Sequence, residues 1–208
     1  MTGRVGAQII AAFHGTSFIE LAAMLLALAY LVLAIRESRA CWWAAFASSL
    51  LYVAVLFRAH LYMESVLNVF YAGMAAYGWW QWRGGRRGDG LRVSRWSLRN
   101  HLGGLVAVLA ASLVTSRWLA ANTAAAWPLA DSLVTWSSVF ATFLVARKVY
   151  ENWHWWLVID SVAAGLYFNR RLYATMLLFM IYLVLIVIGM RQWRRSLDAA
   201  AVAGATHG

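Results

Sequence analysis

A carboxylate and two indole side chains recur at helical spacing within residues 150–168. Asn152, Trp153, Trp156 and Asp160 fall near intervals of three and four, so they share one face of a helix. Aromatic rings beside an acid suit a flat ligand, either cationic or neutral, through stacking and cation–π attraction. We therefore predict that these four residues line a binding site for such a ligand.

A second polar stripe lies within residues 61–82. It includes Asn68 and Tyr71, and Gln81 lies near the end of the segment, while Tyr182 takes the place of Tyr71 later in the chain. Polar groups inside apolar segments are costly in a membrane and usually face a bundle interior or a cavity. We expect Asn68, Tyr71 and Tyr182 to face the same cavity as the first stripe.

Two further segments carry polar side chains at helical spacing. These side chains are Asp131, Thr135, Ser138 and Thr142 in one segment, and Ser48, Ser49 and Tyr52 in the other. Together with the two stripes, they predict that four helices share one cavity.

Structural roles are open alternatives for the same residue types. Tryptophans gather in interfacial belts of membrane proteins, and serines or threonines in a span often only bond to backbone. Asp160 could be a structural carboxylate paired with a neighbouring helix. Glu20 and Asp131 begin apolar segments, where an acid favours the helix N-terminus.

Motifs of enzymes are missing from the chain. There is no Gly-x-Ser-x-Gly, no pair of histidines at metal-binding spacing, no cysteine pair and no phosphate-binding glycine loop followed by lysine. We predict a protein without catalytic residues, metal or cofactor. A membrane-embedded enzyme is the rival hypothesis from another class.

The composition indicates that these helices lie in a membrane. The 208 residues are 63% hydrophobic and 12% charged, whereas a soluble domain is roughly half apolar and a quarter charged. The net charge of +10 would suit nucleic acid in a soluble protein. Here the basic residues cluster between long apolar runs, which is typical of cytoplasmic loops, so we expect no nucleic-acid partner.

Seven segments are long and apolar enough to span a bilayer, which needs roughly 20 residues. They are Ser17–Ile35, Ala40–Phe57, Leu61–Trp82, His101–Trp118, Asp131–Ala146, Tyr150–Phe168 and Leu172–Met190. The sequence thus predicts an all-α membrane protein with seven transmembrane helices.

An internal repeat relates two parts of the chain. Residues 20–83 align without a gap with residues 131–194, at a shift of 111 positions. The matched pairs include Trp42 with Trp153, Tyr71 with Tyr182, Gly78 with Gly189, and Trp82 with Trp193. Three crossings reverse the chain direction and a linker helix restores it, so two parallel repeats form a 3+1+3 bundle.

The repeat sets the predicted organisation of residues 1–208 as a single transmembrane transporter domain. The first three-helix repeat covers residues 17–83, and a basic loop with the linker helix covers 84–130. The second repeat covers 131–195, and residues 196–208 form a tail that we expect to be disordered. A site at the interface of two repeats is typical of secondary transporters.

Charge asymmetry predicts the orientation. Of the 18 lysines and arginines, thirteen lie on one side of the predicted spans and five on the side of the amino terminus. The five are Arg4, Arg58, Arg117, Arg170 and Arg171. The positive-inside rule places the amino terminus outside and the carboxyl terminus in the cytoplasm.

The run from Glu151 to Trp156 contains a Trp-x-x-Trp element, which Asp160, Tyr182 and Trp193 follow. Similar residues occur at the matched positions of the first repeat. Together, these residues resemble the PnuC family of bacterial vitamin transporters over roughly residues 17–195. The resemblance implies a SWEET-like fold and a homotrimer in the bacterial inner membrane. It also implies import of nicotinamide riboside by facilitated diffusion, followed by trapping through cytoplasmic phosphorylation. Relatives that carry thiamine or riboflavin leave those vitamins as alternatives.

The resemblance also implies roles for individual residues. Trp153 and Trp156 would contact nicotinamide riboside, and Asn152 lies beside that motif. Further polar contacts in the family come from interior faces, for which Asn68, Gln81 and Asp160 are the candidates here.

Overall fold

The computed structural model describes residues 17–58, 62–83, 90–123, 127–169 and 173–205 of the chain. These residues form seven helices and no strand beyond one isolated bridge. The helices are α2 (Phe18–Ile35), α3 (Ala40–Arg58), α4 (Tyr62–Arg83), α5 (Leu98–Asn122), α6 (Pro128–Ala146), α7 (Asn152–Asn169) and α8 (Tyr173–Ala205). The prediction of an all-α protein is confirmed for this part of the chain.

Local sequence accounts for where two of these helices begin. Ser17 caps α2, because its hydroxyl accepts a hydrogen bond from the backbone N–H of Glu20 while the Glu20 carboxylate accepts one from Ser17. The expected capping role of Glu20 is therefore confirmed. Pro128 opens α6, where a missing N–H has no cost.

Five of the described helices are long and apolar enough to cross a membrane. They are α2, α3, α5, α6 and the Met176–Ala200 part of α8. The two others, α4 and α7, carry the Asn, Asp, Tyr and Trp residues on which the predicted site depends, and these residues lower the hydropathy of both helices.

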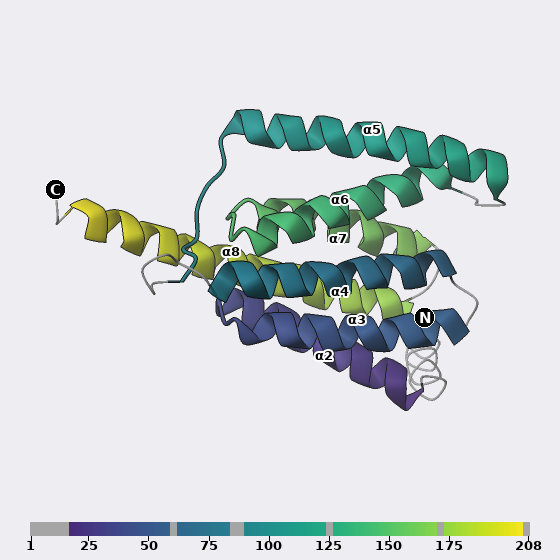
Figure 1. Ribbon diagram of the computed structural model, residues 1–208, viewed down its shortest axis with the longest axis horizontal. Helices are drawn as coiled ribbons and strands as arrows, with labels where there is room; N and C mark the ends of the chain where they lie inside the picture. The colour runs from purple at the N-terminus through teal and green to yellow at the C-terminus, as the bar shows by residue number, and fades with distance from the viewer. Residues whose placement is uncertain (1–16, 59–61, 84–89, 124–126, 170–172, 206–208) are drawn as a thin grey trace.

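The helices pack as two groups of consecutive neighbours (Figure 1). In one group α3 packs against α2 and α4, and in the other α7 packs against α6 and α8. The groups meet where α4 contacts α6 and where α2 contacts α8. Among the described helices, α5 packs only on α6, and Figure 1 shows it along the outside of the bundle.

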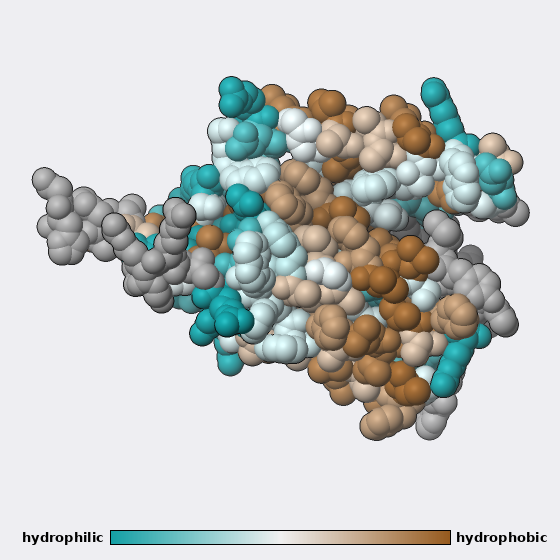
Figure 2. All heavy atoms as spheres, in the orientation of Figure 1, coloured by the Kyte–Doolittle hydropathy of each residue, from teal (hydrophilic) through white to brown (hydrophobic). Residues whose placement is uncertain are grey.

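The outer surface of the bundle is apolar. Large hydrophobic side chains such as Leu25, Val66 and Val184 are mostly exposed, and Figure 2 shows hydrophobic residues across the middle of the visible face with hydrophilic ones gathered toward its ends. Such a surface suits lipid better than water.

Matched positions in the two groups pack alike. Trp42 of α3 lies against Gly78 of α4, and Trp153 of α7 lies against Gly189 of α8. A methyl group at Gly189 would come within 2.5 Å of the Trp153 ring. The two glycines are therefore notches that accept the indole rings.

One end of the bundle holds most of the buried aromatic core. We call it the basic end, because Arg36, Arg39, Arg83, Arg147 and Lys148 lie there. Four tryptophans meet at this end: Trp42 contacts Trp82, Trp82 contacts Trp193, and Trp193 contacts Trp153. All four are no more than 2% exposed.

One segment differs from the prediction, and the basic loop is more ordered than its composition indicates. The α8 helix continues through residues 196–205, where we expected a disordered tail, because alanine strongly favours helix. Residues 90–97 of the basic loop cross the basic end and are tied to it, since Ser94 exchanges backbone hydrogen bonds with Lys148 and Tyr150 at 3.0 and 2.8 Å. Residues 84–89 of that loop lie outside the described residues.

Candidate functional site

A cavity of about 610 Å³ lies between the two helix groups. Its walls come from α2, α4, α6, α7 and α8. The aromatic residues in these walls are Tyr30, Tyr71, Trp153, Trp156, Tyr167, Phe179 and Tyr182. The volume and the aromatic walls fit a small flat molecule.

The helical pattern of α7 and α8 brings most of the predicted site residues together. Trp153, Trp156 and Asp160 project from one face of α7 into the cavity, as their spacing predicts. Tyr182 faces them from α8, and its counterpart Tyr71 reaches the cavity from α4.

Three predicted residues do not reach the cavity wall. Asn152 is fully buried in the first turn of α7, where its amide nitrogen donates a hydrogen bond to the Val149 carbonyl oxygen at 2.6 Å. The Gln81 amide donates to the Tyr77 hydroxyl at 2.6 Å near the basic end. Asn68 lies on α4, half-buried, and is not a wall residue.

The expected contribution of four polar helices is correct only in part. Asp131, Thr135 and Ser138 of α6 line the cavity, but no residue of α3 does. The Ser48 hydroxyl of α3 instead donates to the Ala23 carbonyl oxygen of α2 at 2.8 Å. This matches the open alternative that serines in a span satisfy backbone groups.

Sequence reasoning missed Tyr30 and Phe179. Tyr30 lies in the strongly apolar α2, which carries no polar stripe to single it out. Phe179 stacks on Tyr167 at 5.3 Å between ring centres, with both rings in the cavity wall. The only available signal was their aromatic character within apolar helices.

The charged side chains in the described walls of the cavity are both carboxylates. Its described walls contain Asp131 and Asp160 but no lysine, arginine or histidine. Asp160 is 6% exposed, and its carboxylate forms no hydrogen bond or ion pair with any described residue. Apolar walls strengthen the field of such a group, which favours a positively charged partner.

The matched part of the first group lacks both key side chains. At the shift of 111 positions, Trp156 corresponds to Ala45 and Asp160 to Ser49. The notch tryptophans and glycines are the same in both groups, whereas these two cavity positions differ. The two groups therefore share the packing of tryptophan on glycine and differ at these two cavity positions.

The cavity is open at one end and closed at the other. Asp131, which is exposed at the start of α6, forms part of the wall at the open end. At the basic end the wall consists of Ala34, Val145 and Trp153, which are at most 3% exposed. The end beside Asp131 is therefore the end at which we expect a ligand to enter, and Trp153 closes the other end.

Comparison with known proteins agrees with this architecture. The family described as nicotinamide mononucleotide transporter matches residues 17–195. The riboflavin/roseoflavin transporter RibM of Streptomyces davaonensis is 30% identical, and the alignment covers 81% of each chain. The nicotinamide riboside transporter PnuC of Escherichia coli is 26% identical, with 70% of this chain and 72% of the relative covered.

The fold is also that of a solved transporter. A crystal structure of the vitamin B3 transporter PnuC superposes with a TM-score of 0.72 at 20% identity, over 94% of this chain and 88% of the other. The relatives are transporters and not enzymes, in agreement with the missing enzyme motifs. The chain belongs to the nicotinamide mononucleotide transporter family, which includes PnuC, and is a multi-pass membrane transporter.

Proposed function

We propose that this transporter imports nicotinamide riboside, a flat aromatic nucleoside with a positively charged ring. The observation that carries the proposal is Asp160, a buried carboxylate without a described partner in an aromatic cavity. An unpaired buried charge is costly, and a cationic ring beside it would offset that cost. Thiamine, which is also cationic and aromatic, is the alternative within this class.

A phosphorylated substrate fits the cavity less well. A phosphate group in the membrane interior needs cationic donors, and the described walls offer none. We therefore favour the nucleoside over the mononucleotide for which the family is named.

Riboflavin is a second candidate because RibM is among the similar relatives. Its ring system could stack on the same aromatic walls, but a neutral ring gains little from the charge of Asp160. The effect of this one carboxylate on affinity thus separates the two candidates.

We assign the wall residues as follows. Trp156 stacks on the ring, Asp160 supplies the negative charge, and Tyr71 and Tyr182 offer hydroxyls to the sugar. Trp153 closes the cavity toward the basic end. The assignments of Asn152, Asn68 and Gln81 depend on the sequence pattern and the family resemblance, because none of the three lines the cavity.

We further propose the arrangement in the cell. The chain forms seven spans in a 3+1+3 bundle with the amino terminus outside, within a homotrimer of the bacterial inner membrane. The matched notches support the two repeats, and the charge asymmetry supports the orientation. The homotrimer follows from the family resemblance. Transport is facilitated diffusion by alternating access, and cytoplasmic phosphorylation traps the substrate.

The test of the substrate compares binding of nicotinamide riboside, thiamine and riboflavin to the purified protein and to Asp160→Asn. Loss of the charge should weaken binding of the two cations by about tenfold, equivalent to ~1.4 kcal/mol, and leave riboflavin binding unchanged. Asp198→Asn is the matched control, because Asp198 is exposed on α8 outside the cavity. Tight riboflavin binding with no binding of either cation would reject the proposal.

The test of the mechanism is uptake of the labelled substrate into proteoliposomes. The inside concentration should rise to the outside concentration and stop there, with or without a pH gradient. Accumulation that a protonophore abolishes would instead make Asp160 a proton carrier.

A further inference from the structure

An ion pair joins the two helix groups at the closed end of the cavity. The Lys148 ammonium lies 3.1 Å from a carboxylate oxygen of Glu37, and the two side chains are 10% and 21% exposed. Glu37 and Lys148 are separated by 111 positions, which is the shift of the internal repeat. The two residues therefore occupy equivalent positions of the two repeats, carry opposite charges and form an ion pair with each other.

The backbone at both positions takes a conformation that favours glycine. Glu37 and Lys148 directly follow the C-cap residues of α2 and α6 and have φ angles of 54° and 49°. Their N–H groups donate to Ala34 and Val145, and the next residues donate to Leu33 and Leu144, which is the Schellman pattern in both turns. Glycine is the usual residue at this position, so the charged side chains have a purpose that the turn does not supply.

The ion pair lies on the tryptophan cluster. The Lys148 ammonium is 4.6 Å from the centre of the Trp82 ring. The Trp82 indole N–H donates to the Val145 and Ala146 carbonyl oxygens at 3.3 and 3.1 Å, and that of Trp193 donates to Ala34 at 3.0 Å. Each of these hydrogen bonds crosses from one helix group to the other.

The same cluster blocks the path of a ligand. Ala34, Val145 and Trp153 belong both to the cavity wall and to the buried core at the basic end. A ligand that leaves through this end must part α2 from α8 and α4 from α6. That separation breaks the cross-group hydrogen bonds and the ion pair together.

We propose that Trp82 and Trp193 form a gate that closes the cavity at the basic end. The Glu37–Lys148 ion pair stabilises the closed state of this gate, and we call this ion pair the latch. The latch rests on the proposed alternating access of this transporter. Parting of the gate exposes the cavity to the cytoplasm in the proposed orientation.

The test measures access to the cavity without any substrate. Ser138→Cys, in a Cys41→Ala background, places a thiol in the cavity wall, and a membrane-impermeant maleimide is applied to vesicles of each orientation. Labelling from the basic end should be slow in the parent protein. In Glu37→Gln it should be about fivefold faster, because loss of a partly exposed ion pair changes an equilibrium by about this factor. Labelling from the open end is the positive control for the reporter.

Three further variants separate the latch from a folding defect. Glu37→Gly and Lys148→Gly suit the left-handed backbone, so they keep the turn and should still speed labelling from the basic end. The charge reversal Glu37→Lys with Lys148→Glu should return the slow rate. Glu20→Gln, at the opposite end of α2, is the matched control and should leave the rate unchanged.

Two results would overturn the latch: parental labelling in both glycine variants, or fast labelling in the charge reversal. Neither result bears on the substrate, because no substrate is present. Conversely, if nicotinamide riboside does not bind, the proposed substrate is wrong, but the labelling rates still test the gate.

Discussion

The two tryptophans of the Trp-x-x-Trp element have different surroundings. Trp153 is 1% exposed, and its ring lies in the Gly189 notch 5.4 Å from the ring of Trp193. Trp42 takes the same place in the first group, so this packing is part of the framework. Trp156 has no such counterpart and is the better candidate for stacking on a substrate.

Replacement of Trp156 by alanine should weaken substrate binding by about 1–3 kcal/mol, the scale of a stacked aromatic ring. The apparent melting temperature in detergent should change little, because the Trp156 side chain faces a cavity. Trp80→Ala, which removes an indole that is 64% exposed, is the control. Calorimetric titration gives the affinities. If both variants bind the substrate equally well, Trp156 does not contact the substrate.

Trp153→Ala should behave differently. Removal of this buried ring leaves a void beside Gly189 and Trp193, and such changes cost about 3–5 kcal/mol of stability in protein cores. We expect a marked fall of the melting temperature. A variant of parental stability that fails to bind would instead show that Trp153 acts only on the substrate.

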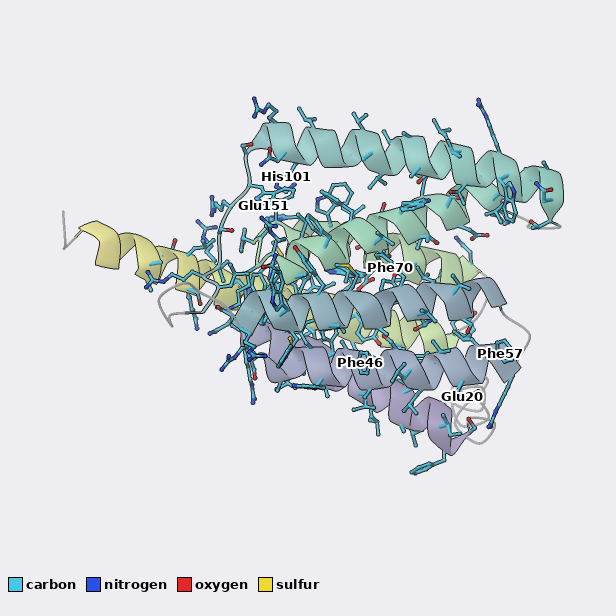
Figure 3. All side chains as sticks on the ribbon, viewed as in Figure 1. Glu20, Phe46, Phe57, Phe70, His101 and Glu151 are labelled. Carbon is cyan, nitrogen blue, oxygen red and sulfur yellow. The ribbon has the colours of Figure 1, made fainter. Side chains whose placement is uncertain are left out.

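At the scale of elements, the segment before α5 is more than a linker. The Trp96 backbone N–H donates to a carboxylate oxygen of Glu151 at 3.2 Å, and the same oxygen lies 3.6 Å from His101 of α5. Figure 3 shows Glu151 and His101 together at the basic end, with Glu20 and Phe57 at the opposite end. The start of α5 is thereby anchored to the start of α7.

The notch glycines give a prediction for helix packing. Gly189→Ala places a methyl group against the Trp153 ring and should lower the melting temperature, because α7 and α8 must move apart. Gly165→Ala on α7 is the matched control, since nothing lies within 4 Å of the added methyl and alanine favours helix. Similar melting temperatures for the two variants would contradict the close packing of Trp153.

At the scale of the whole molecule, charge and apolar surface agree on a membrane location. We expect the carboxyl terminus in the cytoplasm, from the thirteen-to-five distribution of basic residues. A reporter that is active only in the periplasm, fused after the last residue, should therefore be inactive. The same reporter joined to the amino terminus should be active, and the reverse pattern would invert the proposed direction of the gate.

The sequence by itself determined the helices, their apolar character and the face of α7 that carries Trp153, Trp156 and Asp160. Hydrophobic periodicity is a property of the local sequence, so it can be recognised without knowledge of the fold. The same face also includes Asn152, but its position in the first turn gives its amide a backbone partner and removes it from the cavity.

Only the tertiary structure decided which distant side chains meet. Tyr30 reaches the cavity from an apolar helix without a polar stripe, and Lys148 reaches Glu37 across the chain. These contacts depend on how α2 packs against α8 and how α4 packs against α6, between segments far apart in sequence. Spacing along one helix fixes the face of a residue, but the neighbour of that face is set by packing between helices.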